Sequence, residues 1–226
     1  MATVPRKIEY PTSDGKPMAE TTIHRDAMID LIQTLQARYA DDPMVYVSGN
    51  MLMFYEEGNR RKHLSPDVFL VLGIPDTLRH NYLLWEEGKG PDLVIELTSK
   101  SSRREDQEKK RDLYRDVLRV AEYILFDPLG EYLRPPLQGY RLADGDYLPI
   151  EPVAGRLPSL VTGLQFEANG PELRLFDPTL GRWLPNLRER TSAAEARAET
   201  AEAEVERLRR EIEALKRAKA NRANGA

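Results

Sequence analysis

Cysteine is absent from this 226-residue chain, and that absence removes several classes of chemistry at once. Without cysteine there is no disulfide framework, no zinc–thiolate site and no cysteine nucleophile. Long hydrophobic runs are missing too. No apolar stretch approaches the roughly 18 residues needed to span a bilayer, and none near Met1 is typical of a secretion signal. We therefore expect a cytoplasmic protein with no membrane partner.

Several familiar functional signatures are also lacking. The chain has no glycine-rich phosphate loop, nucleophile elbow or dinucleotide fingerprint. Its three histidines, His24, His63 and His80, do not have the spacing of metal ligands, so we interpret each as a surface or capping residue. The net charge of −4 is not the basic balance of a protein that coats nucleic acid.

Two short stretches, residues 65–71 and 91–97, place acidic residues inside apolar runs that otherwise indicate buried strands. Asp92 and Glu96 alternate with aliphatic residues, so both carboxylates point to one face of a strand, and Asp67 begins the other strand. Buried carboxylates are costly unless a cation or a lysine neutralises them, and oxygen ligands suit Mg²⁺ or Mn²⁺. The alternative is that both aspartates cap their strands and Glu96 forms a salt bridge.

Basic residues lie on both sides of this acidic pair of strands. Residues 60–62 are Arg-Arg-Lys, and a basic run that includes Arg103, Arg104 and Lys109 follows the second strand. Such residues could hold phosphates near a metal ion and so bind nucleic acid. A solvated helix face explains the same run without any ligand.

Hydrophobic periodicity predicts mixed α/β structure. Apolar residues at helical spacing predict a helix over 21–39, and another runs from Ser101 or Ser102 to about Val117. The second helix places Asp106, Lys110 and Tyr114 on one face. Strands are predicted over residues 44–48, 51–55, 67–72, 92–97 and 121–127, with a possible turn at 49–50.

Towards the end of the globular part, a hairpin is expected from 140–142 to 147–150, turning at Asp144-Gly145. The segments 160–166 and 173–176 are short and apolar, and indicate peripheral strand or helix. These elements complete a domain that we place at residues 1–185.

The tail, residues 186–226, differs in kind. From Leu187 onward, small and apolar residues alternate spacings of four and three among glutamates and arginines, which is a heptad repeat. The repeat predicts a coiled coil and favours a homo-oligomer, with a dimer as the expected form. A lone amphipathic helix is the alternative, although it would leave the apolar seam over 205–215 in water.

The order of these motifs resembles the Uma-two family of putative restriction endonucleases, a branch of the PD-(D/E)XK nuclease superfamily. The resemblance rests on Pro66-Asp67, on the stretch from Pro91-Asp92 to Glu96, on the Asp106, Lys110 and Tyr114 spacing and on residues 122–128. The opening residues 10–20 and the tail also look like one branch of the family. The resemblance implies a restriction-endonuclease-like core, in which helices flank a central mixed β-sheet.

It also implies a metal-dependent nuclease that cleaves DNA with an activated water, using Mg²⁺ or Mn²⁺. The residues that match metal ligands are Asp67, Asp92 and Glu96, the backbone carbonyl of Leu97 and, for a second metal, Glu20. Glu20 could instead be a helix-capping charge.

The chain departs from the superfamily pattern at the catalytic lysine. Thr98 or Val94 stands where the pattern places it on the strand, and Lys110 on the following helix occupies the place of the family's lysine. A catalytically inactive nuclease-fold module, which binds nucleic acid or protein and self-associates through its tail, is therefore the alternative function.

Overall fold

The computed structural model describes residues 9–13, 21–99, 102 and 105–224 of the chain. It divides into two compact units, Met1–Leu184 and Pro185–Ala226. Within the described ranges, no helix is both long enough and apolar enough to cross a membrane.

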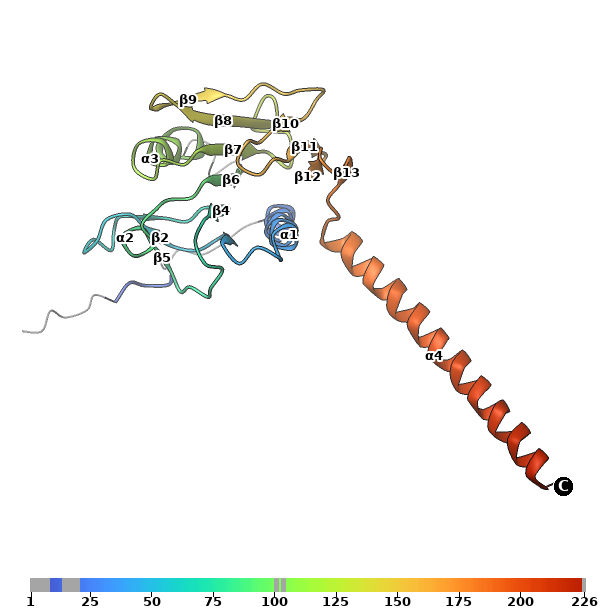
Figure 1. Ribbon diagram of the computed structural model, residues 1–226. Helices are drawn as coiled ribbons and strands as arrows, with labels where there is room; N and C mark the ends of the chain where they lie inside the picture. The colour runs from blue at the N-terminus through green and yellow to red at the C-terminus, as the bar shows by residue number, and fades with distance from the viewer. Residues whose placement is uncertain (1–8, 14–20, 100–101, 103–104, 225–226) are drawn as a thin grey trace, which may run out of the picture. The chain divides into compact units, whose positions relative to one another are not determined.

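A six-stranded mixed sheet forms the centre of the first unit (Figure 1). Strands β6 and β7 are parallel, and all other neighbours in this sheet are antiparallel. The strands, in their order across the sheet, are β1 (Val45–Ser48), β4 (Val68–Leu72), β6 (Leu93–Leu97), β7 (Glu122–Phe126), β8 (Leu137–Ala143) and β9 (Asp146–Pro149). The mixed sheet with flanking helices confirms the predicted fold class.

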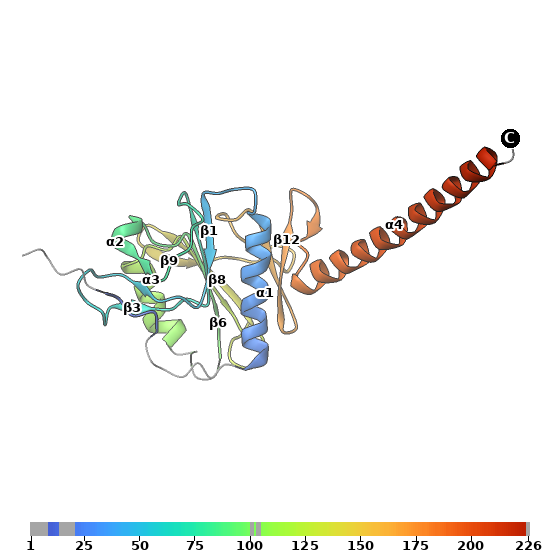
Figure 2. The same cartoon turned by 90° about the horizontal axis from the view of Figure 1, so that it is seen from below.

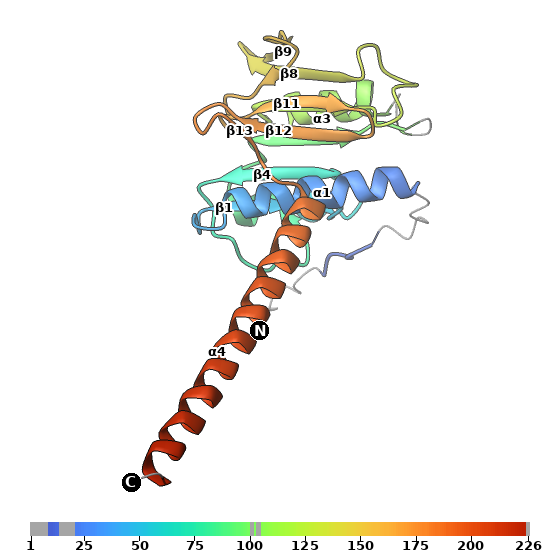
Figure 3. The same cartoon turned by 90° about the vertical axis from the view of Figure 1, so that its right-hand side faces the viewer.

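Both faces of the central strands β4, β6 and β7 are buried, which explains why these strands are mostly apolar. In β4, Val68 and Leu70 enter one core, while Phe69 and Val71 enter the other. The first face packs against helix α1 (Thr22–Arg38) and a four-stranded sheet, as Figure 3 shows. That sheet consists of β10 (Leu157–Pro158), β11 (Gln165–Asn169), β12 (Glu172–Asp177) and β13 (Arg182–Trp183).

The opposite face packs against a second layer of small elements (Figure 2). The chain enters helix α3 (Arg111–Asp116) through a π-helical turn, η1 (Glu105–Lys110). Beside them lie the short helix α2 (Leu84–Glu87) and a three-stranded sheet of β2 (Met53–Phe54), β3 (His63–Leu64) and β5 (Tyr82–Leu83). The candidate site forms on this side, at one end of β4 and β6.

Several local predictions are confirmed and others are wrong. Asp144 and Gly145 both have positive φ, of 51° and 89°, and form the expected hairpin turn between β8 and β9. Of the two short apolar segments, 173–176 lies in β12, whereas 160–166 is mostly turn and only its last two residues belong to β11. However, residues 49–50 do not form a hairpin turn, because the Asn50 N–H donates to the Pro66 carbonyl and β2 pairs with β3 and β5.

The second unit is one helix, α4 (Leu187–Asn224). It begins at a reciprocal cap: the Glu189 N–H donates to Asn186 Oδ1 at 2.8 Å, and the Asn186 N–H donates to Glu189 Oε2 at 2.9 Å. This exchange satisfies two backbone donors at the helix start. The predicted tail helix is present, while its pairing into a coiled coil stays a prediction.

Candidate active site

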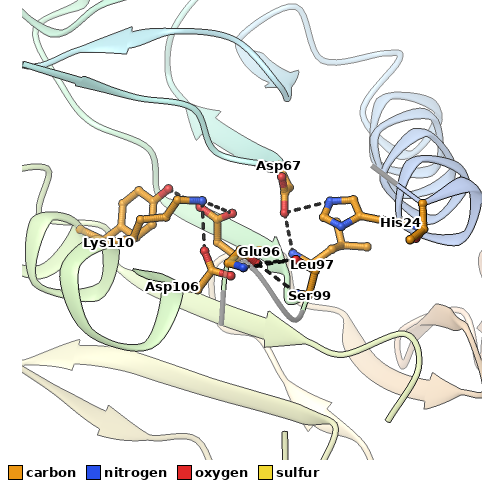
Figure 4. Close-up of polar contacts among 10 residues, drawn as sticks. His24, Asp67, Glu96, Leu97, Ser99, Asp106 and Lys110 are labelled. Carbon is orange, nitrogen blue, oxygen red and sulfur yellow. Dashed lines mark hydrogen bonds and ion pairs between the residues drawn. The ribbon is translucent and has the colours of Figure 1, made fainter. Parts of the chain in front are cut away.

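Asp67 and Glu96 lie next to each other because of how β4 and β6 pair. The antiparallel register matches Val68 with Ile95, so the next pair outward is Asp67 and Glu96. Asp67 Oδ2 accepts the backbone N–H of Leu97 at 2.7 Å, which fixes its carboxylate beside the end of β6 (Figure 4). Two acidic residues that are distant in sequence are thus held at one end of the sheet.

Glu96 is fully buried, and two side chains from the following helix hold its carboxylate. Lys110 Nζ donates to Oε2 at 2.9 Å, and the Tyr114 hydroxyl donates to Oε1 at 2.5 Å. Burial raises the pKa of Glu96 well above its usual range, and the nearby charge of Lys110 only partly opposes that rise. The carboxylates of Asp67 and Asp106 add to it by repulsion.

Lys110 lies between two carboxylates. Its Nζ is 2.9 Å from Glu96 Oε2 and 3.1 Å from Asp106 Oδ1. Burial alone would lower the pKa of Lys110, but the charges of Glu96, Asp106 and Asp67 raise it above its ordinary value. The lysine is therefore charged at neutral pH, and it is an electrostatic group rather than a general base.

The helical segment η1 and α3 brings these groups together by spacing alone. Asp106, Lys110 and Tyr114 are four residues apart, so they project towards the end of β6 from one side of the helix. The Tyr123 hydroxyl on β7 donates to the Asp106 carbonyl at 2.9 Å and fixes the π-helical turn. Such turns often mark functional sites, and this one contains both Asp106 and Lys110.

His24 also belongs to this site, and the sequence interpretation of it as a surface or capping residue is wrong. Its side chain is largely buried, and its Nε2 lies 3.4 Å from Asp67 Oδ2. Although burial raises the pKa of Asp67, the His24 hydrogen bond and the charge of Lys110 bring that pKa below its ordinary value. The only hint in the sequence was the position of His24 in the first turn of α1, three residues after the N-cap Thr21.

Asp92 does not join the cluster. It shares the sheet face of Glu96, as predicted, but four residues of extended strand separate the two by about 13 Å. Its carboxylate accepts the Leu72 N–H at 2.7 Å and pairs with Lys89 Nζ at 2.8 Å. Asp92 thus occupies the other end of β6 with a lysine of its own, which matches the strand-capping alternative.

The remaining predicted residues divide into two groups. Glu20, Arg103 and Arg104 lie outside the described residues. Lys109 is exposed on the π-helical turn, and its positive charge interacts electrostatically with Tyr55. Burial raises the pKa of that tyrosine, and Lys109 partly opposes the rise. An exposed cation next to the cluster is compatible with a contact to a phosphate.

The carboxyl groups of Asp67, Glu96 and Asp106 surround the ammonium of Lys110, and His24 adds a favourable charge interaction beside Asp67. In the described part of the chain, no three acidic or histidine side chains already converge as a metal cage. The donor set still fits a hard divalent cation, because it offers the carboxylate oxygens that such cations prefer.

The fold and this cluster together define a mixed α/β protein with the restriction-endonuclease-like core expected from the sequence. The chain belongs to the Uma2 family, described as putative restriction endonucleases, whose family model matches residues 3–173.

Among solved structures, the chain is similar to a putative nuclease belonging to DUF820 from Anabaena variabilis ATCC 29413. The identity is 13% and the TM-score 0.46, with 67% of this chain and 81% of that chain covered. This likeness is too remote to assign a role to any residue. A comparison with curated proteins found no match.

Proposed function

We propose that this protein is a divalent-metal-dependent endonuclease that hydrolyses phosphodiester bonds of DNA. The observation that carries the proposal is the buried cluster in which Glu96 contacts Lys110 and Tyr114 beside Asp67, in a member of a restriction endonuclease family. Three acidic groups around one lysine are costly to bury, and a cation together with a phosphate substrate gives that arrangement a use.

Asp67 and Glu96 would hold the metal ion, with the carbonyl of Leu97 as a third ligand. The N–H of Leu97 already points to Asp67, and the carbonyl of a strand residue lies on the same edge as its N–H. Bound Mg²⁺ or Mn²⁺ supplies two things, a lowered pKa for water and neutralisation of phosphate charge. Glu20 is a proposed contributor to a second metal.

The protein's own groups then have distinct tasks. Lys110, which is charged and largely buried, would orient the attacking water or stabilise the charge that develops on the phosphate. Tyr114 would keep the Glu96 carboxylate in position, and His24 would do the same for Asp67. Lys109, with Arg103 and Arg104, would contact phosphates of the bound DNA.

Cleavage of supercoiled plasmid in Mg²⁺ or Mn²⁺ tests this proposal. We expect Asp67→Asn, Glu96→Gln and Lys110→Met each to slow cleavage by about 100-fold or more. Asp92→Asn is the matched control: it alters the other Pro-Asp strand start, and its side-chain oxygen can still accept the Leu72 N–H. It should therefore cleave at nearly the wild-type rate.

Two results would contradict the assignment. If Lys110→Met cuts as fast as the wild type, the cluster is not the active site. If calorimetry of the folded wild-type protein shows no heat of binding with millimolar Mg²⁺ or Mn²⁺, and no cutting occurs, the inactive binding module is the better description. The unfolding transition of each variant shows whether a loss of activity reflects a loss of structure.

A further inference from the structure

Helix α4 carries an apolar stripe that nothing in its own unit covers in the described residues. Val205, Leu208, Ile212 and Leu215 are 48%, 43%, 51% and 64% exposed, on a helix whose other residues are mostly charged or alanine. Their spacings of three, four and three align them along one side of the helix. A stripe of this kind is stable in water only when a partner covers it.

We propose that the partner is a second copy of α4, paired in parallel and in register as a two-stranded coiled coil. In the heptad register, β-branched Val205 and Ile212 occupy a positions, while Leu208 and Leu215 occupy d positions. Branched residues at a with leucine at d favour two parallel strands over three or four. The inference does not depend on whether the protein cleaves DNA.

The charges that flank the stripe support this arrangement. In a parallel dimer, each g residue faces the e residue five positions later on the partner helix. This places Glu204 against Arg209 and Glu211 against Lys216, both pairs of opposite charge. Glu204 contacts Arg207 at 2.6 Å in the single helix, so it would exchange a neighbour in its own helix for one on the partner.

In the alanine-lined half of the helix, the facing g and e residues again have opposite charges, but the positive residue is now at g. Here arginines occupy g and glutamates occupy e, so Arg190 faces Glu195 and Arg197 faces Glu202. All four pairings between the two helices are therefore attractive, although the first half offers little apolar surface. This self-complementarity points to a second copy rather than to an unrelated protein.

An antiparallel pairing meets this pattern less well. Overlapping the four bulky residues of two antiparallel helices would bring Glu204 and Glu211 of one chain against the same glutamates of the other. The alternative antiparallel overlap, centred on the whole helix, would face Val205 with Leu208 but would face Ile212 and Leu215 with alanines. Only the parallel register joins bulky layers to bulky layers and opposite charges to each other.

The outward face of α4 is already satisfied within the helix. Arg210 Nε lies 3.1 Å from Glu206 Oε1, and Arg217 Nε lies 3.9 Å from Glu213 Oε2. Both pairs are four residues apart and occupy b and f positions, away from the stripe. The helix therefore has one face suited to solvent and one suited to a partner.

Sedimentation equilibrium of the full chain tests the proposal, with an expected mass of twice 25.8 kDa at micromolar concentration. Leu208→Glu should give the monomer mass. Arg210→Glu introduces the same side chain on the outer face, so it should remain a dimer. A monomeric wild type, a trimer or a tetramer would overturn the proposal.

Charge exchange tests the flanking pairs. The double variant Glu204→Lys, Glu211→Lys places like charges in both pairs of the bulky half, as does Arg209→Glu, Lys216→Glu. Each should dissociate more readily than the wild type, and a mixture of the two should form a heterodimer. If both variants stay as dimeric as the wild type, these charges do not form the interface.

The absence of cysteine allows a direct test of orientation. Leu208→Cys at a d position should form an intermolecular disulfide under mild oxidation, because in the parallel register the two substituted positions face each other. Arg210→Cys, two residues on and facing outward, should not. A dimer that does not crosslink through position 208 would overturn the parallel, in-register arrangement.

Discussion

At the scale of single residues, the site is organised around Glu96, a fully buried carboxylate on a central strand. An isolated carboxylate could not be charged there, since the desolvation cost is large. Lys110 and Tyr114 each donate to one of its oxygens, so both oxygens of the carboxylate accept a hydrogen bond. The orientation of this group towards Asp67 therefore depends on one helix.

Tyr114 offers a test of that dependence. Replacing it by phenylalanine keeps the buried ring and removes only the hydroxyl that donates to Glu96. We expect Tyr114→Phe to lower the free energy of unfolding by about 1.5–3 kcal/mol, as for a lost hydrogen bond to a charged group. We also expect Mg²⁺ affinity, measured by calorimetry, to fall about 10- to 100-fold.

The control for this prediction is Tyr147→Phe, since the Tyr147 hydroxyl donates to the buried Val120 carbonyl and has no contact with Glu96. It should lower stability without a comparable change in metal affinity. Unchanged metal affinity in folded Tyr114→Phe would show that the hydroxyl does not position the ligand.

Asp106 contributes to the change of stability with pH in the metal-free protein. Burial raises its pKa, and the charge of Lys110 only partly opposes this. The folded state therefore binds a proton more tightly than the unfolded chain does. This tighter proton binding stabilises the folded state. The stabilisation is complete at a pH below the ordinary carboxyl pKa, and it is lost as the pH rises through the raised pKa of Asp106. Glu96, whose pKa is also raised, acts in the same direction, and Asp67, whose pKa is lowered, acts in the opposite one.

We therefore expect Asp106→Asn to reduce the loss of stability on going from about pH 5 to about pH 8 in the absence of divalent metal. Urea unfolding in EDTA at several pH values measures it. If variant and wild type lose stability in parallel, burial of Asp106 does not cause the dependence.

At the residue scale, the sequence could predict the acidic pair of Asp67 and Glu96 but not all of its surroundings. Asp67, Glu96 and Lys110 were found because Pro-Asp strand starts and a four-residue helical spacing are local patterns. His24 was missed because its contact with Asp67 joins a helix to a distant strand, and no spacing records that. Asp92 matched the pattern as well as Asp67 did, and only the strand register separates their positions.

At the scale of elements, the end of β1 sets the position of Asp67. A Cβ added to Gly49 would lie 2.0 Å from the Asp67 carbonyl oxygen and 2.7 Å from Ile32 Cδ1. The backbone after β1 can approach the start of β4 this closely only because residue 49 has no side chain. A glycine that looked like part of a hairpin turn is thus a packing residue beneath the site.

Gly49→Ala should displace the Asp67 backbone and lower the free energy of unfolding by about 1–3 kcal/mol, the usual cost of overpacking. Gly90→Ala is a matched control, because its Cβ would lie 2.3 Å from the Leu118 carbonyl oxygen, near the opposite end of β6. We expect similar destabilisation from both, but weaker Mg²⁺ binding only for Gly49→Ala. Equal metal affinity in the two folded variants would contradict this role.

The hydrophobic pattern of the sequence predicts the central strands of the sheet but not the short strands beside it. The strands β4, β6 and β7 were predictable because each is a continuous apolar run buried on both faces. The predicted strand over 51–55 was too long, because β2 pairs with two short strands in a separate sheet rather than with β1. The π-helical turn could not be predicted, since it depends on contacts such as that between Tyr123 and the Asp106 carbonyl.

At the scale of the whole molecule, a dimer formed through α4 would carry two nuclease sites. On the proposed function, such a dimer has both sites available to one DNA molecule, so the second strand is cut before dissociation more often. We expect the wild type to give more linear plasmid for each nicked molecule than Leu208→Glu, at equal total cutting. Gel quantification early in the reaction measures this ratio. Equal ratios would show that pairing does not coordinate the two cuts, whatever the sedimentation result.

The gathering of carboxyl groups around Lys110 has a consequence for the order of events. Whenever Asp67, Glu96 and Asp106 are ionised together, they repel a phosphodiester until a cation neutralises them. The protein without its cation would then have little tendency to remain on DNA at this site. On the proposed function, the same divalent cation is required for DNA binding at this site and for cleavage. The enzyme would therefore bind a strand there only when it is also able to cut it.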